Sequence, residues 1–405
     1  MLLQLKKIVL NKPLILTLWF GLSLFAAVKG VHYHDGVFTT DHNNYFVYKH
    51  NFLNLIQQHS LFGEQPEFYF DLNHYGPVFG LIIAPFALMP DAIGVILWVM
   101  FLAWSLYFAI MKMPLTDMQK TVILALNVNS IMGSSGNVQV NPLIIAFVLF
   151  SFIFIRKQQD FWAALMIILG TAIKLYGVVG LALFFFSDNK IKLVLGLIFW
   201  SAVLFVLPML VSSPAFIIKT YHDWYPDLVA KNAANMVSTR AYVCVMGMLS
   251  RIFNIVPFPT LTVLIPGMAL FAWSMFRIKY WRNLQYQLLL LASTLIFSII
   301  FSSSSEPPTY IIAFIGVSIW YVNLDRPITG YERFLLIFAL VVTNFSPSDL
   351  FPRYLREHLV FPYYLNVLPC LMIWFKIIHE MITKEFKEYP QATEWHLATT
   401  KQVRA

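Results

Sequence analysis

The residue whose chemistry stands out in this sequence is Lys174, which lies inside the apolar run GTAIKLYGVVGLALFFF at 170–186. An unpaired lysine at the centre of a bilayer costs about 2.5–3.5 kcal/mol on insertion scales, so such a residue normally faces a cavity or a partner. Gly170, Gly177 and Gly180 surround it and predict a broken helix with close packing. We interpret Lys174 as a ligand for a lipid phosphate in a polar pocket. A structural ion pair, or an ammonium group that extends to the membrane surface, is the alternative.

Two amide side chains occupy positions where a helix facing hydrocarbon would carry leucine or valine. They are Gln139 and Asn141, in the segment GSSGNVQVNPLI at 133–144. Either they form hydrogen bonds between helices, each worth about 0.6–2 kcal/mol, or they line a hydrophilic cavity and contact sugar hydroxyls. The residues alone leave both interpretations open.

Glu306 and Tyr310 stand at the start of another apolar segment, SSSSEPPTYIIAF at 302–314. Serine and glutamate followed by proline are typical of the first turn of a helix. A carboxylate on the same side of the membrane as Lys174 is also a candidate pocket acid. The segment therefore predicts a helix start and, as the alternative, a binding contribution from these two side chains.

The segment 30–75 is rich in acids and histidines and is a candidate source of a general base. A base requires only one carboxylate within reach of an acceptor hydroxyl, whereas solvated loop residues are the default interpretation of such acids. The tetrapeptide HYHD at 32–35 could bind a metal ion, but no HExxH or DxD motif accompanies it. We therefore expect no metal and no other cofactor.

Helices within a membrane must position these residues. Of the 405 residues, 59% are hydrophobic and only 12% are charged, which is about half the charged share of a soluble domain. The longer apolar runs can cross a hydrocarbon core of ~30 Å. We expect an all-α polytopic membrane protein with about ten to twelve crossings. The candidate segments are 14–28, 77–88, 92–111, 119–133, 140–155, 160–172, 175–186, 191–212, 260–277, 285–302, 307–322, 333–345 and 359–381.

The distribution of lysine and arginine predicts the orientation, because cytoplasmic loops carry an excess of both. The basic residues between these segments and in the tail would lie in the cytoplasm. The loops 30–75 and 213–259 would then lie outside, within a single domain 1–385 that precedes a cytoplasmic tail, 386–405. The net charge of +8 fits positive cytoplasmic loops and gives no indication of nucleic-acid binding.

Both outer loops contain stretches that predict helices lying at the membrane surface. These are NNYFVYKHNFLNLIQQHSLF at 43–62, apolar at helical spacing, and SPAFIIKTYHDWYPDLVAKNAANM at 213–236. Arg353 and Arg356 break the positive-inside trend at the outer start of the last segment. Basic residues there favour an anionic ligand such as a lipid phosphate; contact with lipid headgroups alone is the alternative.

Four stretches, in this order, resemble glycosyltransferase family 87: NNYFVYKHNFLNLI, YGPVFGLIIAPFALMPD, QVNPLIIAFVLFSF and FWAALMIILGTAIKLYGVVGLALFF. The family comprises membrane enzymes of the GT-C fold, and its best-known members are mannosyltransferases that depend on polyprenyl-phosphate mannose. The likeness covers about residues 10–380. Its closing stretches, SSEPPTYIIAFIGVSIW and YYLNVLPCLMIWFKII, resemble a bacterial subgroup, which implies a multi-pass protein of the bacterial inner membrane.

The resemblance also assigns roles to particular positions. The family's Tyr-Pro-Pro is matched by Tyr75-Gly76-Pro77 with one departure, and its Gln-x-Asn by Gln139 and Asn141. Its helix break at Ile/Leu-Lys-Pro corresponds to Lys174, which would bind the donor phosphate.

The resemblance implies that a hexose, mannose in the best-known members, passes from a polyprenyl phosphate to a lipid or glycan acceptor at the outer face. Such enzymes invert the anomeric carbon, and an acid of the outer loop deprotonates the acceptor. Here Asn44 stands at the position of the family's acid, and asparagine accepts no proton at neutral pH. Asp41 is the nearest substitute, followed by Asp35. A transporter or flippase for a lipid or small anion, or an inactive relative, is the alternative function.

Overall fold

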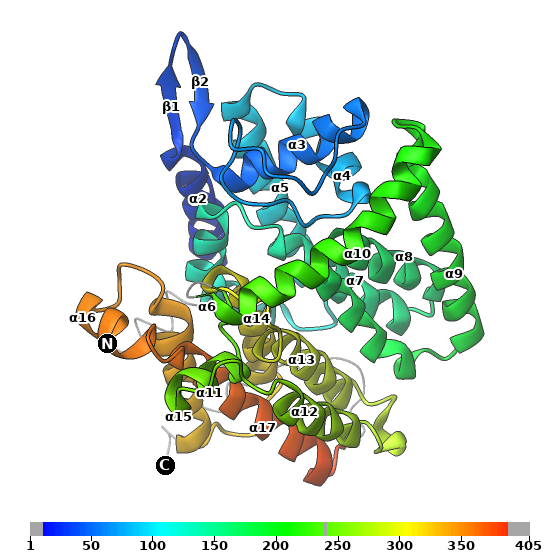
Figure 1. The fold of residues 1–405 in the computed structure, drawn as a ribbon. Coiled ribbons are helices and arrows are strands. Elements are labelled where there is room, and N and C mark those ends of the chain that lie inside the picture. The colour runs from blue at the N-terminus through cyan, green and yellow to red at the C-terminus, as the bar shows by residue number, and fades with distance from the viewer. Residues whose placement is uncertain (1–10, 239–240, 388–405) are drawn as a thin grey trace. The chain divides into compact units, whose positions relative to one another are not determined.

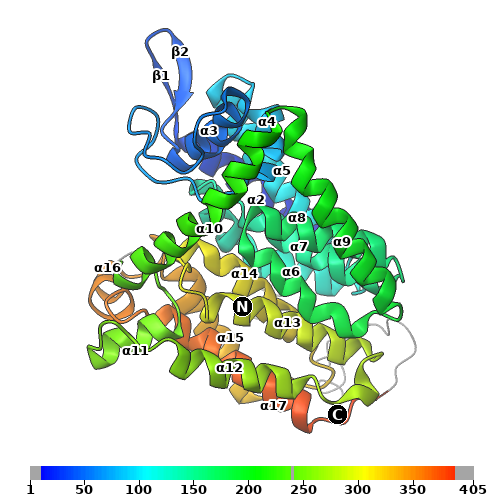
Figure 2. The ribbon, with the colours of Figure 1, turned by 45° about the vertical axis from the view of Figure 1, so that its right-hand side comes forward.

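The computed structural model describes residues 11–238 and 241–387 as an almost entirely helical chain (Figures 1 and 2). In the described residues, four helices are long and apolar enough to cross a membrane: Lys12–Lys29, Asp91–Lys112, Lys190–Leu210 and Leu365–Thr383. Shorter apolar helices of 10–17 residues accompany them. The expectation of an all-α polytopic membrane protein is confirmed, and the orientation and the number of crossings remain predictions.

The first part of the chain contains one hairpin and a series of helices. In chain order these elements are α2 (Lys12–Lys29), β1 (Val31–His34), β2 (Val37–Thr40), α3 (Asn43–Gln57), α4 (Pro77–Ala87), α5 (Asp91–Lys112), α6 (Asp117–Gly136), α7 (Asn141–Arg156), α8 (Asp160–Ile173), the 3₁₀ helix η1 (Leu175–Phe186), α9 (Lys190–Val206), η2 (Leu207–Leu210) and α10 (Pro214–Val237).

The second part contains helices and no strand among its described residues, and two of its helices, η5 and η6, are π-helical. Its elements are α11 (Val245–Phe253), α12 (Leu261–Ser274), η3 (Ile278–Tyr280), α13 (Leu284–Ile300), η4 (Pro307–Tyr310), α14 (Ile311–Val322), α15 (Gly330–Phe338), η5 (Ala339–Phe345), α16 (Arg353–Leu355), η6 (Arg356–Val360), η7 (Leu365–Val367) and α17 (Leu368–Thr383).

The expected apolar segments coincide with these helices to within a few residues. The segments 160–172 and 175–186, for example, become α8 and η1. The expectation of one segment over 359–381 is wrong at its start, because Tyr364 adopts a φ of 51° and no helix continues through a left-handed residue. The helices expected within 43–62 and 213–236 are present as α3 and α10, and their position at the membrane surface remains a prediction.

Contacts within the chain divide it into two compact units. The N-terminal unit comprises Thr17–Ala109 and Ile131–Asn235. The C-terminal unit comprises the described residues of Met1–Leu16, Ile110–Ser130 and Met236–Ala405. The helices α2, α5, α6 and α10 contribute residues to both, and each unit is described separately below.

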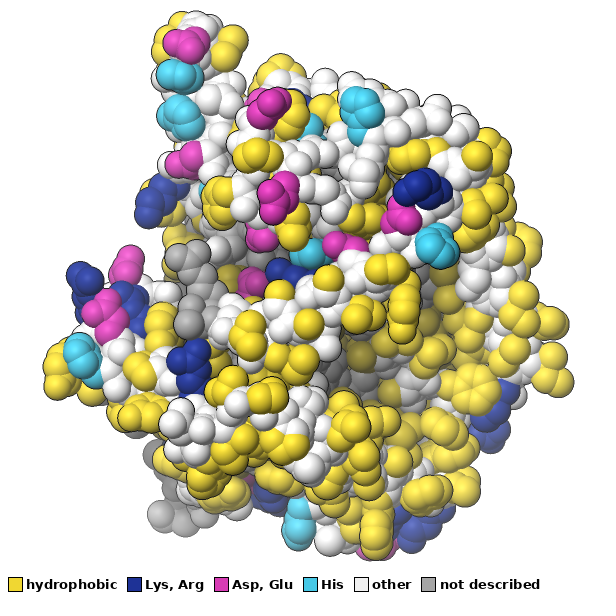
Figure 3. Space-filling model, in the orientation of Figure 1, with side chains coloured by type: hydrophobic (Ala, Val, Ile, Leu, Met, Phe, Trp, Pro, Cys, Tyr) yellow, Lys and Arg dark blue, Asp and Glu magenta, His cyan; other side chains and the backbone are white. Residues whose placement is uncertain are grey.

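In the N-terminal unit, α8 packs against α7, α9 and η1, and α4 joins α3 to α8. Figure 2 shows α7, α8 and α9 side by side. The apolar window of Lys190–Leu210 is only 22% buried, and hydrophobic side chains cover this flank in Figure 3. An apolar face of this kind suits contact with lipid chains.

The hairpin of β1 and β2 is a feature that the sequence analysis missed. Val31 pairs with Thr40 and His34 with Val37, so two residues, Asp35 and Gly36, form the turn. Their φ values are 48° and 85°, as a type I′ turn requires, and Asp-Gly is one of the sequences that favour it. The tip of the hairpin carries acidic and histidine side chains (Figure 3).

The C-terminal unit is built around α13, which packs closely against α14 and also against α17. A Cβ added at Gly316 would lie 2.7 Å from the carbonyl oxygen of Ala292, which shows how near the two backbones approach. Trp374 of α17 is fully buried and its indole nitrogen donates to Ser293 at 3.0 Å. Small residues and a polar contact between helices are typical of packing inside membranes.

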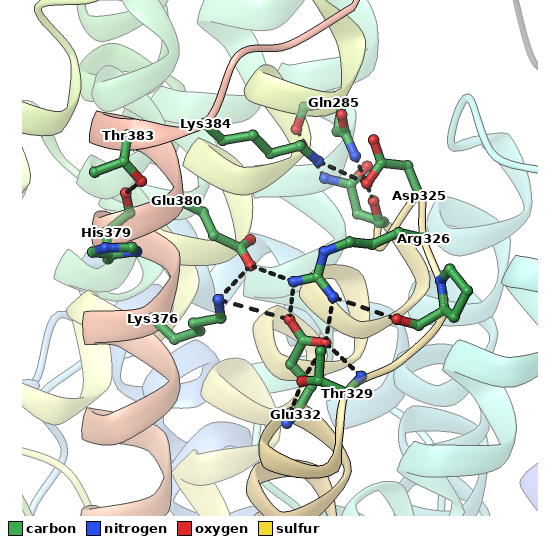
Figure 4. Close-up of polar contacts among 12 residues, drawn as sticks. Gln285, Asp325, Arg326, Thr329, Glu332, Lys376, His379, Glu380, Thr383 and Lys384 are labelled. Carbon is green, nitrogen blue, oxygen red and sulfur yellow. Dashed lines mark hydrogen bonds and ion pairs between the residues drawn. The ribbon is translucent and has the colours of Figure 1, made fainter.

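An ion-pair cluster joins the start of α15 to the end of α17 (Figure 4). Glu332, whose side chain is 1% exposed, accepts from Arg326 at 2.5 Å and lies 3.7 Å from Lys376, which also pairs with Glu380 at 3.1 Å. Burial alone raises the pKa of Glu332, but hydrogen bonds from Arg326 and Thr329 outweigh this effect and hold the pKa at about 2. The carboxylate therefore stays charged in the folded protein.

Replacing Glu332 by glutamine should lower the free energy of unfolding by about 1.5–3 kcal/mol at pH 7, because the change removes the buried charged acceptor of the hydrogen bonds from Arg326 and Thr329. The pKa falls from its ordinary 4.5 to about 2 on folding, so the stabilisation is complete above about pH 4.5 and is lost as the pH falls toward 2. Thermal unfolding of the purified protein in detergent at pH 7 and at pH 3 measures both effects, and the difference between wild type and variant should shrink at pH 3.

The matched control is Glu357→Gln, which removes a more exposed carboxylate paired with Arg353 at 2.7 Å. Such surface pairs contribute about 0–1 kcal/mol. Equal shifts for the two variants would show that the buried cluster does not stabilise the C-terminal unit.

Candidate active site

Lys174 lies at a break between two helices of the N-terminal unit. α8 ends at Ile173, Lys174 is extended with φ −149° and ψ 132°, and η1 begins at Leu175. η1 turns back onto α8 so closely that a Cβ added at Gly177 would lie 2.1 Å from the carbonyl carbon of Gly170. The broken helix with close packing that the glycines predict is confirmed.

The break brings together three residues selected from the sequence. The ammonium of Lys174 donates to Oδ1 of Asn141 at 3.3 Å, and the Nδ2 of Asn141 is 3.4 Å from Oε1 of Gln139. Lys174 also lies 5.0 Å from the centre of the Tyr176 ring. Asn141 is fully buried at the start of α7, so the structure places an amide and a cation in contact inside the unit.

Tyr75 and Gly76 approach the same end of α8. The hydroxyl of Tyr75 is 3.2 Å from that of Tyr48, and its backbone carbonyl accepts from Asn51. A Cβ added at Gly76 would lie 2.7 Å from the carbonyl oxygen of Ala172 and 2.8 Å from the Trp224 ring. A proline at position 76, as in the Tyr-Pro-Pro of the resemblance, would collide with both groups. The space at this position therefore admits only glycine.

The adjacent His74 forms a hydrogen bond with Asp227 that the sequence analysis missed. Its Nδ1 is 2.7 Å from Oδ2 of Asp227 on α10, and the two side chains are only 17% and 12% exposed. The indole nitrogen of Trp224, one turn earlier on α10, donates to the backbone carbonyl of His74 at 2.9 Å. The sequence analysis assigns no individual role to His74. No signal in one sequence could pair residues 153 positions apart.

The two candidate acids occupy the hairpin and its end. Asp35 lies in the turn with its side chain 86% exposed and 3.2 Å from Nε2 of His34. Asp41 is also exposed and follows β2, where its backbone N–H donates to Gly30 at 2.9 Å. Asn44, which the resemblance aligns with the family's acid, donates from Nδ2 to the carbonyl of Asn137 at 2.7 Å. An aspartate could not donate this hydrogen bond.

The other four selected residues belong to the C-terminal unit. Glu306 caps η4 through a reciprocal pair of contacts with Thr309, which confirms the helix start expected there. The buried hydroxyl of Tyr310 donates to the carbonyl of Val243 at 2.9 Å. These contacts give both residues a structural role within their own unit.

Arg353 and Arg356 differ in their surroundings. Arg353 is 80% exposed and pairs with Glu357. Arg356 is mostly buried, donates to the carbonyl of Ser348 at 3.1 Å and lies 3.4 Å from Asp349. In the part of the chain that the structure describes, no three histidine, cysteine or acidic side chains gather closely enough to hold a metal ion.

A comparison with known families decides the class of protein. The model of glycosyltransferase family 87 matches residues 73–303, which is more than half of the chain. The chain belongs to glycosyltransferase family 87. No curated protein matches it. The matched region contains Lys174, Asn141 and the His74–Asp227 pair, whereas Asp35, Asp41 and Asn44 precede it. With its apolar helices, the family 87 chain is a membrane glycosyltransferase.

The contact between Gly170 and Gly177 yields a prediction for this glycosyltransferase. In Gly177→Ala the added methyl group must displace η1 from α8, which should cost about 1–3 kcal/mol and move Lys174 away from Asn141. We expect at least a tenfold loss of glycosyl transfer together with a lower midpoint of thermal unfolding. Gly21→Ala in α2 is the control, because nothing lies within 4 Å of the added group. Unchanged transfer in Gly177→Ala would show that the contact between Gly170 and Gly177 is not needed to position Lys174 for activity.

Proposed function

We propose that this family 87 enzyme transfers a hexose, most simply mannose, from a polyprenyl-phosphate-linked donor to a lipid or glycan acceptor at the outer face of a bacterial inner membrane. The proposal includes a GT-C architecture, with α3 and α10 as helices at the outer surface. The observation that carries it is the ammonium of Lys174, held at a helix break against Asn141. A cation inside an apolar helical unit is costly and normally serves a ligand.

The chemistry suits a phosphate leaving group. When the bond between the anomeric carbon and the phosphate oxygen breaks, negative charge grows on that oxygen. A lysine positioned beforehand in a site of low dielectric stabilises this charge more in the transition state than in the bound donor. We assign this role to Lys174. Asn141, Gln139 and Tyr75 are assigned contacts to sugar hydroxyls, because amides and phenols both donate and accept hydrogen bonds.

The acceptor hydroxyl must lose a proton as it attacks, so a base is required. The family resemblance offers Asp41 and then Asp35 for this role. Both are exposed near the hairpin. The described residues also contain a third candidate for the base, the His74–Asp227 pair.

Four residues of the C-terminal unit complete the proposed set. Arg353 and Arg356 carry fixed positive charge and are assigned to an anionic lipid headgroup. Glu306 and Tyr310 are assigned a secondary contribution to binding, in addition to their contacts within the unit. Because these roles concern only affinity, substitution at any of the four should change substrate binding more than the rate of the chemical step.

Purified protein in phospholipid vesicles, incubated with polyprenyl-phosphate mannose or glucose, tests the function. Release of polyprenyl phosphate with transfer of the sugar is the expected result. Donor that binds but is never cleaved would indicate an inactive relative. Intact donor that moves between the leaflets would indicate a flippase. Family membership favours the enzyme over the transporter.

Lys174→Met should weaken donor binding by about 10- to 100-fold, because a hydrogen bond to a charged group contributes about 1.5–3 kcal/mol. Binding of polyprenyl-phosphate mannose to the purified variant measures this effect directly. Lys157→Met, at the exposed C-terminal end of α7, removes the same charge outside the site and is the control. If the two variants bind the donor as the wild type does, Lys174 has a structural role only.

A further inference from the structure

The His74–Asp227 pair contains a buried polar atom that lacks a partner. Nε2 of His74 is shielded from solvent and makes no hydrogen bond to any described residue. A buried polar atom without a partner costs about 1–3 kcal/mol, so such atoms are few in folded proteins and each requires an explanation. A substrate group that pairs with Nε2 would supply one.

The contact with Asp227 determines what Nε2 can do. An ionised carboxylate only accepts hydrogen bonds, so Nδ1 of His74 must carry the proton that the 2.7 Å contact shares. In the neutral ring, Nε2 then bears a lone pair and is the basic nitrogen. The ring is held further by Trp224, which binds the backbone carbonyl of His74. This arrangement is that of a general base with its orienting carboxylate.

The pair also lies close to Lys174. Gly76, two residues after His74, meets the carbonyl of Ala172, two residues before Lys174. At about 3.3–3.6 Å per residue, the backbone of each of the two residues lies within about 7 Å of that contact. The base and the cation therefore belong to one neighbourhood of the N-terminal unit.

We propose that His74, oriented by Asp227, is the catalytic base of this enzyme, in the role that the family resemblance gives to Asp41. The inference rests on the proposed function. The proton of the acceptor hydroxyl passes to Nε2 of His74 while the oxygen forms a bond to the anomeric carbon. The bond from that carbon to the phosphate oxygen breaks with its electron pair on the oxygen, beside Lys174. The carboxylate of Asp227 balances the imidazolium ion that results.

The test compares variants of the full chain in phospholipid vesicles with polyprenyl-phosphate mannose. Donor affinity and the release of polyprenyl phosphate, to lipid or to water as acceptor, are measured separately. His74→Gln keeps a donor for Asp227 but no base, so release should fall by at least about 100-fold while donor affinity stays within about threefold. Asp227→Asn keeps an acceptor for Nδ1 but loses the balancing charge, so its release should lie between those of wild type and His74→Gln.

Matched controls lie nearby. His59 is an exposed histidine after α3, and Asp223 is one turn before Asp227 on α10, where it pairs with Lys219. His59→Gln and Asp223→Asn should each keep release within about threefold of wild type.

Three results would overturn the proposal. The first is release near the wild-type rate in His74→Gln. The second is a loss of donor affinity in both His74→Gln and Asp227→Asn that equals the loss of release, which would make the pair structural. The third is loss of release in Asp41→Asn with His74→Gln unaffected, which would make Asp41 the base. A wild-type protein that releases nothing from mannose or glucose donors would instead overturn the proposed function on which the inference rests.

Discussion

The N-terminal unit depends on one close backbone contact, that of Gly177 with Gly170. Without side chains at these two positions, η1 can lie directly on α8, and the chain reverses at Lys174. The reversal exposes backbone groups and a cation inside an apolar unit, which is costly unless both are satisfied. Asn141, buried at the start of α7, accepts from the ammonium. The packing of α7, α8 and η1 and the polar character of the site are therefore consequences of the same break.

A second contact joins this break to distant parts of the chain. Gly76 meets both the last turn of α8 and the ring of Trp224, so the segments near 75, 173 and 225 converge. Each depends on the others: a larger residue at 76 would displace the tryptophan, and loss of Trp224 would remove the donor that holds His74. The glycine at position 76 is therefore matched to the tryptophan at position 224 of α10, because only a residue without a side chain leaves room for that ring.

Much of the fold could be predicted because the positions of the helices and of the helix break depend on the hydropathy and the glycines of the immediate sequence. The helix break at Lys174 follows from a cation flanked by glycines, and the ends of α8 and η1 agree with the apolar runs to within a residue. The hairpin was missed although Asp35-Gly36 is a strong turn signal, because the surrounding loop was interpreted only for its helix. Asp227 was missed for a different reason. Its partner is 153 residues away, and the local sequence around Asp227 does not indicate which histidine it will contact.

Asn44, which the resemblance aligns with the family's acid, forms a structural hydrogen bond in this protein. Its amide donates to the carbonyl of Asn137 and so ties α3 to the segment that precedes α7. A carboxylate there would lose this hydrogen bond and would face a carbonyl oxygen instead, which is repulsive. The resemblance therefore predicts that a working enzyme takes its base from another residue. His74, whose Nδ1 is held by the mostly buried carboxylate of Asp227 and whose Nε2 has no partner among the described residues, is oriented for that role.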